Sequence, residues 1–269
     1  MKSRLLPALC VSLCLSVSAS AQFAGTSDFT NLTNWSVPAG AGGGSLALNS
    51  GVLEYKSALT TDQAYTAWTL GNAPYTSDWA AQVDVHLANG GLLAGQWVNL
   101  NFSAANSADV PGTGTNMDMV TVAIDRYYGA GTVSGFENTM NAYYLGVNSN
   151  PSPVYVTNAT TDAALAIAFD STTKVISTFY DADGAAGGYV WNLLASDNIG
   201  SGTYNWGMGP SDTFTLVLIG SSAYVDISTG QAYFDNFAVT AVPEPSTYAA
   251  ILGAGALGLG IRRRKLLRR

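Results

Sequence analysis

The chain has 269 residues, which is enough for one large domain or two small ones. Only 11% of its residues are charged, against about 25% in an average soluble domain, whereas 48% are apolar. Between residues 22 and 241 there are 17 acidic and 3 basic side chains, a net charge of −14. Such an acidic segment cannot neutralise a phosphate backbone, which excludes nucleic acid as a partner. Its apolar and aromatic content excludes a disordered chain.

The first 21 residues have the three parts of a secretory signal peptide. Lys2 and Arg4 form a positive n-region, and Leu5 to Val17 form a short apolar segment. Ala19 and Ala21 are the small residues of the cleavage site, so residue 22 is expected to begin the mature protein. We therefore expect the chain to be exported.

The segment between residues 22 and 241 is predicted to be one all-β domain. Short runs of β-branched and aromatic residues alternate with clusters of Gly, Asn, Asp, Ser and Pro, and no stretch keeps a helical period. The strands expected in chain order are 51–55, 80–87, 97–102, 119–124, 142–147, 154–157, 164–169, 175–180, 189–194, 214–219 and 232–239. Strands in this number with turn-rich links predict a single β-sandwich.

Three segments of this domain are similar to the concanavalin A-like and jelly-roll β-sandwiches of exported bacterial proteins. They are an opening pair at 29–35 and 46–55, a hairpin from Ala168 to Asp181, and a closing strand from Ala232 to Val239. The resemblance extends over most of residues 22–241 and implies the same two-layered, all-β fold.

Residues that could perform catalysis are few. The domain contains two glutamates, Glu54 and Glu137, which stand far apart in the sequence, and nothing in the sequence pairs Asp118 or Asp125 with a second carboxylate. A glycosidase needs two carboxylates on either side of the scissile bond. The single histidine, His86, lies on the polar side of an alternating strand, as a surface residue does. The sequence therefore favours a protein that is not an enzyme.

Metal ligands are also scarce. Both cysteines, Cys10 and Cys14, lie within the predicted signal peptide, so the mature protein has no thiolate and no disulfide. Calcium prefers oxygen ligands, and Asp235 resembles the acidic position that helps to bind a structural calcium ion in several jelly-roll carbohydrate-binding modules. The alternative is that Asp235 only accepts hydrogen bonds from backbone at a sheet edge. No other cofactor is expected.

Aromatic side chains are the remaining candidates for a binding site, because the flat C–H faces of sugar rings stack on Trp and Tyr. Successive side chains of a strand point to opposite faces, so one residue of each pair Tyr127–Tyr128 and Tyr143–Tyr144 should leave the core. The residues predicted to stack on a ligand are Trp97, Tyr128, Tyr144 and Trp191.

The C-terminal segment, residues 242–269, contains a second processing signal. Pro243, Glu244 and Pro245 precede an apolar run, Tyr248 to Ile261, of about 14 residues, short of the ~20 typical of a transmembrane helix. The basic cluster that follows acts as a stop-transfer signal on the cytoplasmic side. It consists of Arg262, Arg263, Arg264 and Lys265.

In order, spacing and composition, this segment resembles the PEP-CTERM sorting tail of exported bacterial proteins. The resemblance implies that a membrane-embedded exosortase recognises Pro243, Glu244 and Pro245 and cleaves nearby. It also implies an inner-membrane precursor, held by a short C-terminal transmembrane helix, whose partners are the secretion machinery and this protease. The final location would be the cell surface or the extracellular matrix.

Three functional interpretations follow. The favoured one is an exported, non-enzymatic surface or matrix protein with a signal peptide at 1–21, a β-sandwich at 22–241 and a sorting tail at 242–269. The first alternative is a carbohydrate-binding module of an exopolysaccharide matrix, with polysaccharide as its partner. The second is a divergent glycan hydrolase.

Overall fold

The structure, a computed structural model of the whole chain, describes residues 25–88, 92–108, 117–128, 132–144, 147–149 and 153–241. The predicted signal peptide and the sorting tail, with its cleavage-site, motif and stop-transfer residues, lie outside the described residues. Within those ranges, no helix combines the length and the apolarity that a bilayer crossing requires.

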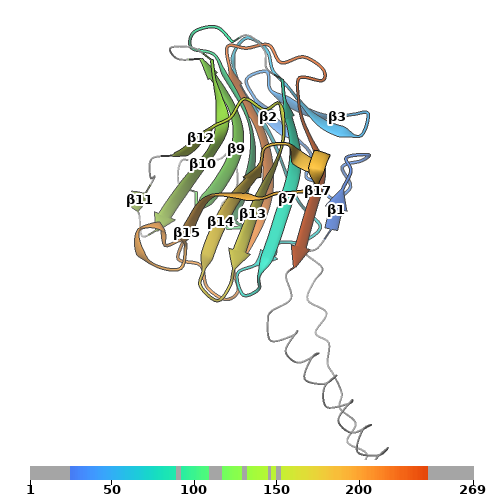
Figure 1. Cartoon of the computed structure of the whole chain (residues 1–269). Helices are drawn as coiled ribbons and strands as arrows, with labels where there is room; N and C mark the ends of the chain where they lie inside the picture. Colours follow the sequence, from blue (N-terminus) through green and yellow to red (C-terminus); the bar gives the residue numbers. More distant parts are fainter. Residues whose placement is uncertain are drawn as a thin grey trace, which may run out of the picture.

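The described residues form two antiparallel sheets that face one another (Figure 1). Sheet I has eight strands in the order β15 (Asn192–Asn198), β14 (Val175–Asp181), β13 (Asp162–Asp170), β7 (Trp79–Leu87), β17 (Ala232–Ala241), β4 (Val52–Lys56) and β3 (Ser45–Asn49), with β1 (Gly25–Ser27) paired to β17. Sheet II has nine strands in the order β11 (Val147–Ser149), β10 (Thr132–Tyr144), β9 (Met119–Tyr128), β8 (Trp97–Asn106), β16 (Thr213–Ala223), β5 (Thr61–Ala67) and β2 (Ala39–Ala41), with β12 (Val154–Thr157) paired to β10 and β6 (Ala73–Pro74) to β16. The predicted all-β sandwich is confirmed.

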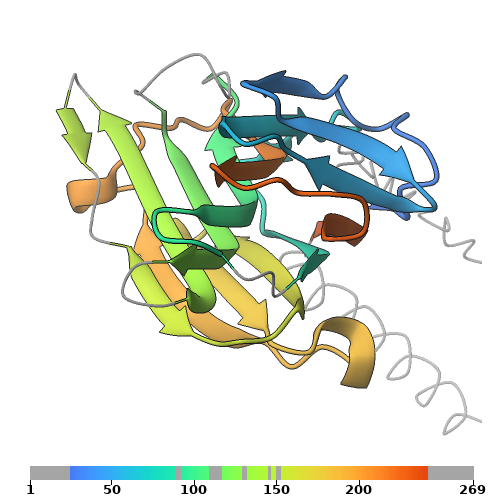
Figure 2. The same cartoon turned by 90° about the horizontal axis from the view of Figure 1, so that it is seen from above.

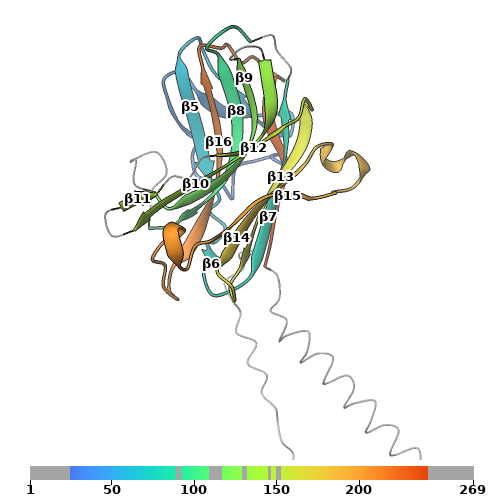
Figure 3. The ribbon, with the colours of Figure 1, turned by 60° about the vertical axis from the view of Figure 1, so that its left-hand side comes forward.

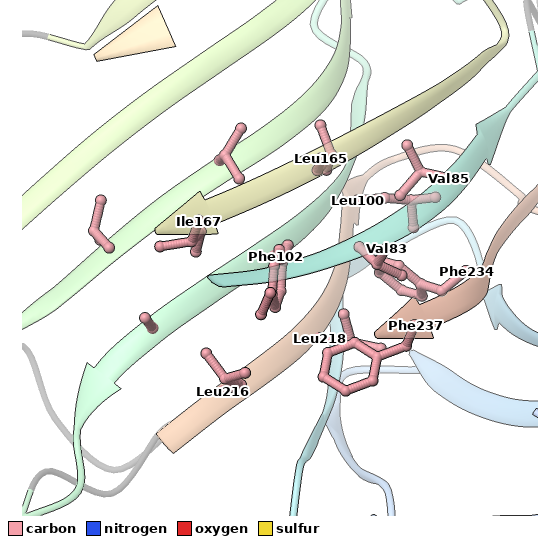
Figure 4. Packing of buried hydrophobic residues seen from close by; sticks show 14 of the residues in the cluster. Val83, Val85, Leu100, Phe102, Leu165, Ile167, Leu216, Leu218, Phe234 and Phe237 are labelled. Atoms are coloured by element: carbon pink, nitrogen blue, oxygen red, sulfur yellow. The ribbon is translucent and has the colours of Figure 1, made fainter. Parts of the chain in front are cut away.

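Alternation along the strands decides which side chains enter the core. In β7 the odd-numbered residues from Trp79 to Leu87 are buried, whereas the even-numbered residues from Ala80 to His86 lie half-buried on the outer face. In β8 and β9 of the other sheet the even-numbered residues from Val98 to Ala104 and from Val120 to Ile124 belong to the core, although several of their odd-numbered neighbours are also buried. The inward side chains labelled in Figure 4 come from both sheets: Val83, Val85, Leu165, Ile167, Phe234, Phe237, Leu100, Phe102, Leu216 and Leu218.

Aromatic rings fill one end of this core. The ring of Trp35 lies 5.1 Å from that of Trp68 and 4.8 Å from that of Phe237, in edge-to-face arrangements. Phe29 stacks on Trp35 at 5.6 Å. Such rings bury a large apolar area in geometries that suit their quadrupoles. The N-terminal strands, blue in Figure 2, come together at this side of the sandwich and close it.

The charged side chain of Arg126 lies within the sandwich. It belongs to β9 of sheet II and is 1% exposed. Its guanidinium donates hydrogen bonds to the main-chain carbonyls of Asp125 at 3.0 Å and Leu87 at 3.1 Å, and to that of Thr160. Because Leu87 ends β7, these bonds join the two sheets. Burial lowers the pKa of Arg126 from its ordinary value, while nearby Tyr155 and Asp125 oppose that shift.

Most of the predicted strands lie within a few residues of observed ones, and 154–157 coincides with β12. The prediction of a strand at 142–147 was wrong, because these residues include the end of β10 and the start of β11. The strand expected at 189–194 begins later, at Asn192, since the chain first passes through a 3₁₀ turn, η1 (Gly184–Gly187).

Strand β5 was not predicted because two of its inward residues are polar. Asp62 is 1% exposed, and its carboxylate accepts hydrogen bonds from the backbone N–H groups of Gly43 at 2.6 Å and Ala58 at 2.7 Å. Thr66, fully buried, donates a hydrogen bond to the carbonyl of Ser36 at 2.7 Å. These bonds allow polar residues to occupy core positions that a sequence pattern assigns to apolar ones.

Gly220 of β16 provides a test of the packing between the sheets. A Cβ at this position would lie 2.3 Å from ring atoms of the buried Tyr55. We expect Gly220→Ala to lower the free energy of unfolding by about 1–3 kcal/mol, because the core has no room for the added methyl group. The measurement is urea unfolding of the full-length protein in mild detergent, followed by tryptophan fluorescence.

Gly209→Ala is the matched control, since a Cβ there would meet nothing closer than a carboxylate oxygen of Asp212 at 3.8 Å. Its stability should change by no more than about 0.5 kcal/mol. An equal loss in both variants would contradict this account of the sandwich interior.

Candidate functional site

Sheet II, whose strands β5, β16, β8, β9 and β10 are labelled in Figure 3, has an outer face that we call the polar face. Small polar side chains line its centre. Cross-strand register defines three adjacent rows on it. The first row contains Gln63, Ser221, Asn99, Asp125 and Gly135. The second contains Tyr65, Ile219, Asn101, Ala123, Glu137 and Tyr155, and the third Ala223, Trp97 and Tyr127.

Hydrogen bonds between strands hold these side chains in place. The amide nitrogen of Asn101 donates to Asn99 Oδ1 at 2.8 Å and to Ser221 Oγ at 3.3 Å, and Ser221 Oγ also donates to Asn99 Oδ1. In a neighbouring row the hydroxyls of Ser103 and Thr121 are 2.8 Å apart. The polar face therefore presents amide and hydroxyl groups in fixed positions.

Two aromatic residues border the polar face at one end. Trp97 of β8 and Tyr127 of β9 are direct cross-strand partners, and Tyr127 is 47% exposed. The expectation that one residue of the Tyr127–Tyr128 pair leaves the core is met by Tyr127. Tyr128, the residue predicted to stack on a ligand, is half-buried and lies on the opposite side of the strand from Tyr127.

The four predicted stacking residues do not form one platform. Trp97 lies on the polar face of sheet II, whereas Trp191 directly precedes β15 at the edge of sheet I. Tyr144 ends β10, and its side chain lies outside the described part of the structure. Trp97, Tyr128 and Trp191 are each half-buried, and the sequence could not assign them to a face.

A pair of carboxylates lies on the polar face, which corrects the interpretation of these acids as unpaired. Asp125 of β9 pairs with Gly135 and Glu137 of β10 pairs with Ala123, so the two acids are diagonal neighbours, two residues apart in register, and both point outward. Asp125 is 9% exposed, and burial together with the nearby Glu137 raises its pKa to about 7, although the backbone N–H and charge of Arg126 act in the opposite direction. Burial also raises the pKa of Glu137.

Tyr155 of β12 completes this group. Its ring passes over Gly135, where a Cβ would lie 2.8 Å from the Tyr155 hydroxyl. Because Gly135 is the register partner of Asp125, the absence of a side chain lets the phenol approach the carboxylate pair. Burial, followed by the charge of Asp125, raises the pKa of Tyr155 to about 12, so its hydroxyl stays protonated near neutral pH.

The outer face of sheet I has a different character. A hollow of about 220 Å³ is floored by alanines of β13, β7 and β17 and is bordered by Phe179 and Trp191. The ring of Trp191 stacks on Tyr189 at 5.2 Å. Gln82 and Thr240 contribute the polar side chains of its lining. This hollow offers an apolar contact surface with few hydrogen-bonding groups.

Three residues weighed from the sequence also lie on sheet I. His86 is on its outer face, where Nδ1 lies 2.7 Å from Asp162 Oδ1 and the ring stacks on Tyr233. Glu54, 2% exposed, accepts a hydrogen bond from the backbone of Gly230 at 2.8 Å. Glu54 and Glu137 are therefore on different sheets and cannot act on one bond.

The third of these residues is Asp235, the predicted calcium ligand. Its carboxylate accepts a hydrogen bond from the backbone N–H of Asn236 at 2.7 Å, and burial raises its pKa. Asp84 is its register partner on β7. Among the described residues, no group of three or more acids, histidines or cysteines has the arrangement of a metal site. A role of Asp235 in calcium binding stays a prediction.

Comparison with known proteins supports the predicted sorting tail and the predicted β-sandwich fold. Residues 241–265 match the PEP-CTERM protein-sorting motif. No curated protein matches the chain.

Solved lectin structures share the fold of the described domain. The lectin UEA-II complexed with galactose superposes with a TM-score of 0.52 at 12% identity, covering 82% of this chain and 99% of the lectin. The Lotus tetragonolobus seed lectin gives 0.52 at 10% identity, with 81% and 98% covered. The exoplasmic domain of VIP36, in its Ca²⁺/Man3GlcNAc-bound form, gives 0.51 at 10% identity, with 81% and 90% covered. The lectin-like β-sandwich is thus confirmed, whereas identities this low show the fold alone.

The carboxylate pair was missed because Asp125 and Glu137 stand twelve positions apart, and most of β10 was not predicted. A signal was present in the sequence: residues 129–131 read Gly-Ala-Gly, a composition typical of a turn, between two runs that each place an acid after an apolar residue. Recognising that hairpin would have brought the two acids to the same face.

The raised pKa of Asp125 makes stability depend on pH. Since the pKa is about 7 in the folded chain and ordinarily 3.8, the stabilising protonated form is fully present below the ordinary value and is lost as pH rises through 7. At pH 8 the folded wild type must hold an ionised Asp125 that burial disfavours, and Asp125→Asn removes this cost. We therefore expect the change in the free energy of unfolding caused by Asp125→Asn to be about 2–4 kcal/mol more stabilising at pH 8 than at pH 4. Urea unfolding of both proteins at the two pH values measures this difference. A pH-independent effect would show that Asp125 titrates normally.

Proposed function

We propose that the chain is an exported protein, sorted by an exosortase-type protease, whose β-sandwich binds carbohydrate on the polar face of sheet II. The observation that supports this most directly is the row of fixed amide, hydroxyl and carboxyl groups beside Trp97 and Tyr127. The match of residues 241–265 to the sorting motif supports export and a membrane-anchored precursor.

The chemistry of the polar face suits a sugar. Hydroxyl groups of a pyranose donate to carboxylate and amide oxygens and accept from amide N–H groups, while its C–H face packs on an aromatic ring. The polar face offers Asn99, Asn101 and Asp125 for the first kind of contact and Trp97 and Tyr127 for the second. Because strand pairing fixes these groups, little conformational freedom is lost on binding.

The hollow on sheet I is less suited to this ligand. Its floor consists of alanines, and a sugar that left water for it would exchange many hydrogen bonds for few. For this reason we assign the glycan to sheet II, even though Trp191 borders the hollow on sheet I.

Glycan hydrolysis is a second candidate function, favoured by a specific observation. A glycosidase uses one carboxyl group with a raised pKa as a general acid and a second carboxylate as nucleophile or general base. Asp125 has a raised pKa and lies near Glu137, so the pair offers both groups. Release of reducing ends from a bound polysaccharide would demonstrate it. Binding without release supports the non-enzymatic, lectin-like function.

The proposed precursor has three parts. Residues 1–21 direct secretion and are removed, residues 22–241 form the binding domain, and residues 242–269 hold the chain in the inner membrane until it is cleaved. The secretion machinery and the sorting protease are its partners during export, and polysaccharide is its partner at the cell surface or in the matrix. A structural calcium ion at Asp235 would add stability without touching the polar face.

Replacing Trp97 tests the binding site. We expect Trp97→Ala in the full-length protein, purified in mild detergent, to weaken retention on immobilised polysaccharide about tenfold or more, because the ring supplies the stacking surface. Trp191→Ala, which removes an aromatic residue of similar exposure from the other sheet, should leave retention unchanged. Loss with Trp191→Ala alone would move the site to the hollow on sheet I.

The sorting tail is tested in the producing cell. Replacing Pro243, Glu244 and Pro245 by alanine should leave the full-length chain in the inner-membrane fraction, because the protease no longer recognises its substrate. Immunoblots of membrane, surface and medium fractions measure this. Unchanged release of a shortened chain would contradict processing at this motif, and a matched triple alanine substitution at 246–248 controls for the change in composition.

A further inference from the structure

We infer that the polysaccharide bound by the polar face contains free amino groups, as in a partly or fully de-N-acetylated hexosamine polymer. The inference rests on the proposed function and adds the chemical class of its ligand. Two features carry it: the carboxylate pair of Asp125 and Glu137, and the absence of a basic side chain from the outer surface of the polar face among the described residues.

Asp125 is buried to more than nine-tenths, yet its side chain points to the outer face, where a ligand would lie. The backbone N–H of the adjacent Arg126 stabilises the charge of this carboxylate, whereas burial and the nearby Glu137 destabilise it. A carboxylate in this position is under-solvated and close to a second one. A cationic donor from outside would stabilise both charges.

The chain provides no such cation on the polar face. Between residues 22 and 261 the sequence has three basic residues, Lys56, Arg126 and Lys174. Lys56 Nζ lies 3.3 Å from Glu54 on sheet I, and Lys174 Nζ donates to the carbonyl of Tyr75 at 3.0 Å above that ring. The guanidinium of Arg126 points inward and donates to main-chain carbonyls. The cation must therefore come from the ligand.

The negative charge of the domain also argues against an anionic polysaccharide as the ligand. A uronate or sulfated chain would place negative groups beside Asp125 and Glu137 in a domain whose net charge is −14. Like charges at a desolvated site cost binding free energy that a neutral polar network does not recover. An ammonium group on a pyranose ring instead meets two carboxylates and the Tyr155 hydroxyl, while the rest of the ring packs near Trp97 and Tyr127.

The experiment compares two hexasaccharides that differ only in acetylation, the glucosamine hexamer and the N-acetylglucosamine hexamer, by calorimetry on the full-length protein in detergent at low salt and about pH 6. We expect the glucosamine hexamer to bind about tenfold more tightly, because an ammonium group that lowers the pKa of one carboxyl by one unit gains a factor of ten. Asp125→Asn and Glu137→Gln should each reduce this preference, taken as the ratio of the two affinities of the same variant, to less than about threefold.

Asp197→Asn is the matched control, since Asp197 also has a pKa raised by burial but lies in β15 of sheet I. The preference should survive in that variant. It should also decline above the pKa of the sugar amine, and at low pH as Asp125 and Glu137 become protonated, the groups that face them being Tyr155 and Arg126.

Equal affinity of the wild-type protein for both hexamers would overturn this inference and leave the proposed function intact, provided that Trp97→Ala weakens both. Absence of binding to either hexamer and to every neutral polysaccharide would overturn both proposals. A preference that persists in both carboxylate variants would assign the cationic contact to another acid and likewise overturn the inference.

Discussion

Packing between the inner faces of the two sheets is the contact on which the rest of this structure depends. The residues that form the two sheets include no cysteine, so no disulfide joins the layers. Aliphatic and aromatic side chains from both sheets supply the cohesion instead, with sheets in such sandwiches about 10 Å apart. Because each strand must send every second residue into this layer, its other residues are committed to an outer face. The binding surface is therefore a consequence of the core, since Val122 and Ile124 point inward and so force Ala123 and Asp125 outward.

Arg126 modifies this rule where β9 nears its end. Arg126 is an even-numbered residue of β9, like the inward Val122 and Ile124, so its guanidinium enters the sandwich. The N–H groups of the guanidinium donate hydrogen bonds to main-chain carbonyls of Asp125, of Leu87 in β7 and of Thr160 in the loop before β13. Removing such a cation from water costs free energy, even when carbonyls accept its hydrogen bonds. In return, the hydrogen bond from Arg126 to Leu87 links β9 of sheet II to β7 of sheet I at fixed positions. The same register holds Asp125 opposite Gly135, beneath the ring of Tyr155. Core and polar face are thus connected through two adjacent residues of one strand.

The two outer faces differ because they use different side chains at equivalent positions. Sheet I has alanines across β13, β7 and β17, which leaves a shallow apolar hollow beside Trp191. Sheet II has amides, hydroxyls and two acids across β8, β9, β10 and β16, bound to one another by hydrogen bonds. Lys56 and Lys174 make their contacts elsewhere and the guanidinium of Arg126 points inward, so no basic side chain lies beside Asp125 and Glu137 on the polar face. This asymmetry, more than the shared lectin-like fold, distinguishes one face as a site for a polar ligand.

The sequence by itself determined the all-β class, most strand positions, the acidic charge and the sorting tail, because alternation, turn residues and an apolar run flanked by charge are local patterns. It did not determine which aromatic residues share a face, as Trp97 and Trp191 show, nor that β5 would bury Asp62. It also left Asp125 and Glu137 as separate acids. Only the tertiary structure decided these points, because register between strands distant in sequence brings side chains together, and burial then shifts their pKa values in ways that no local pattern encodes.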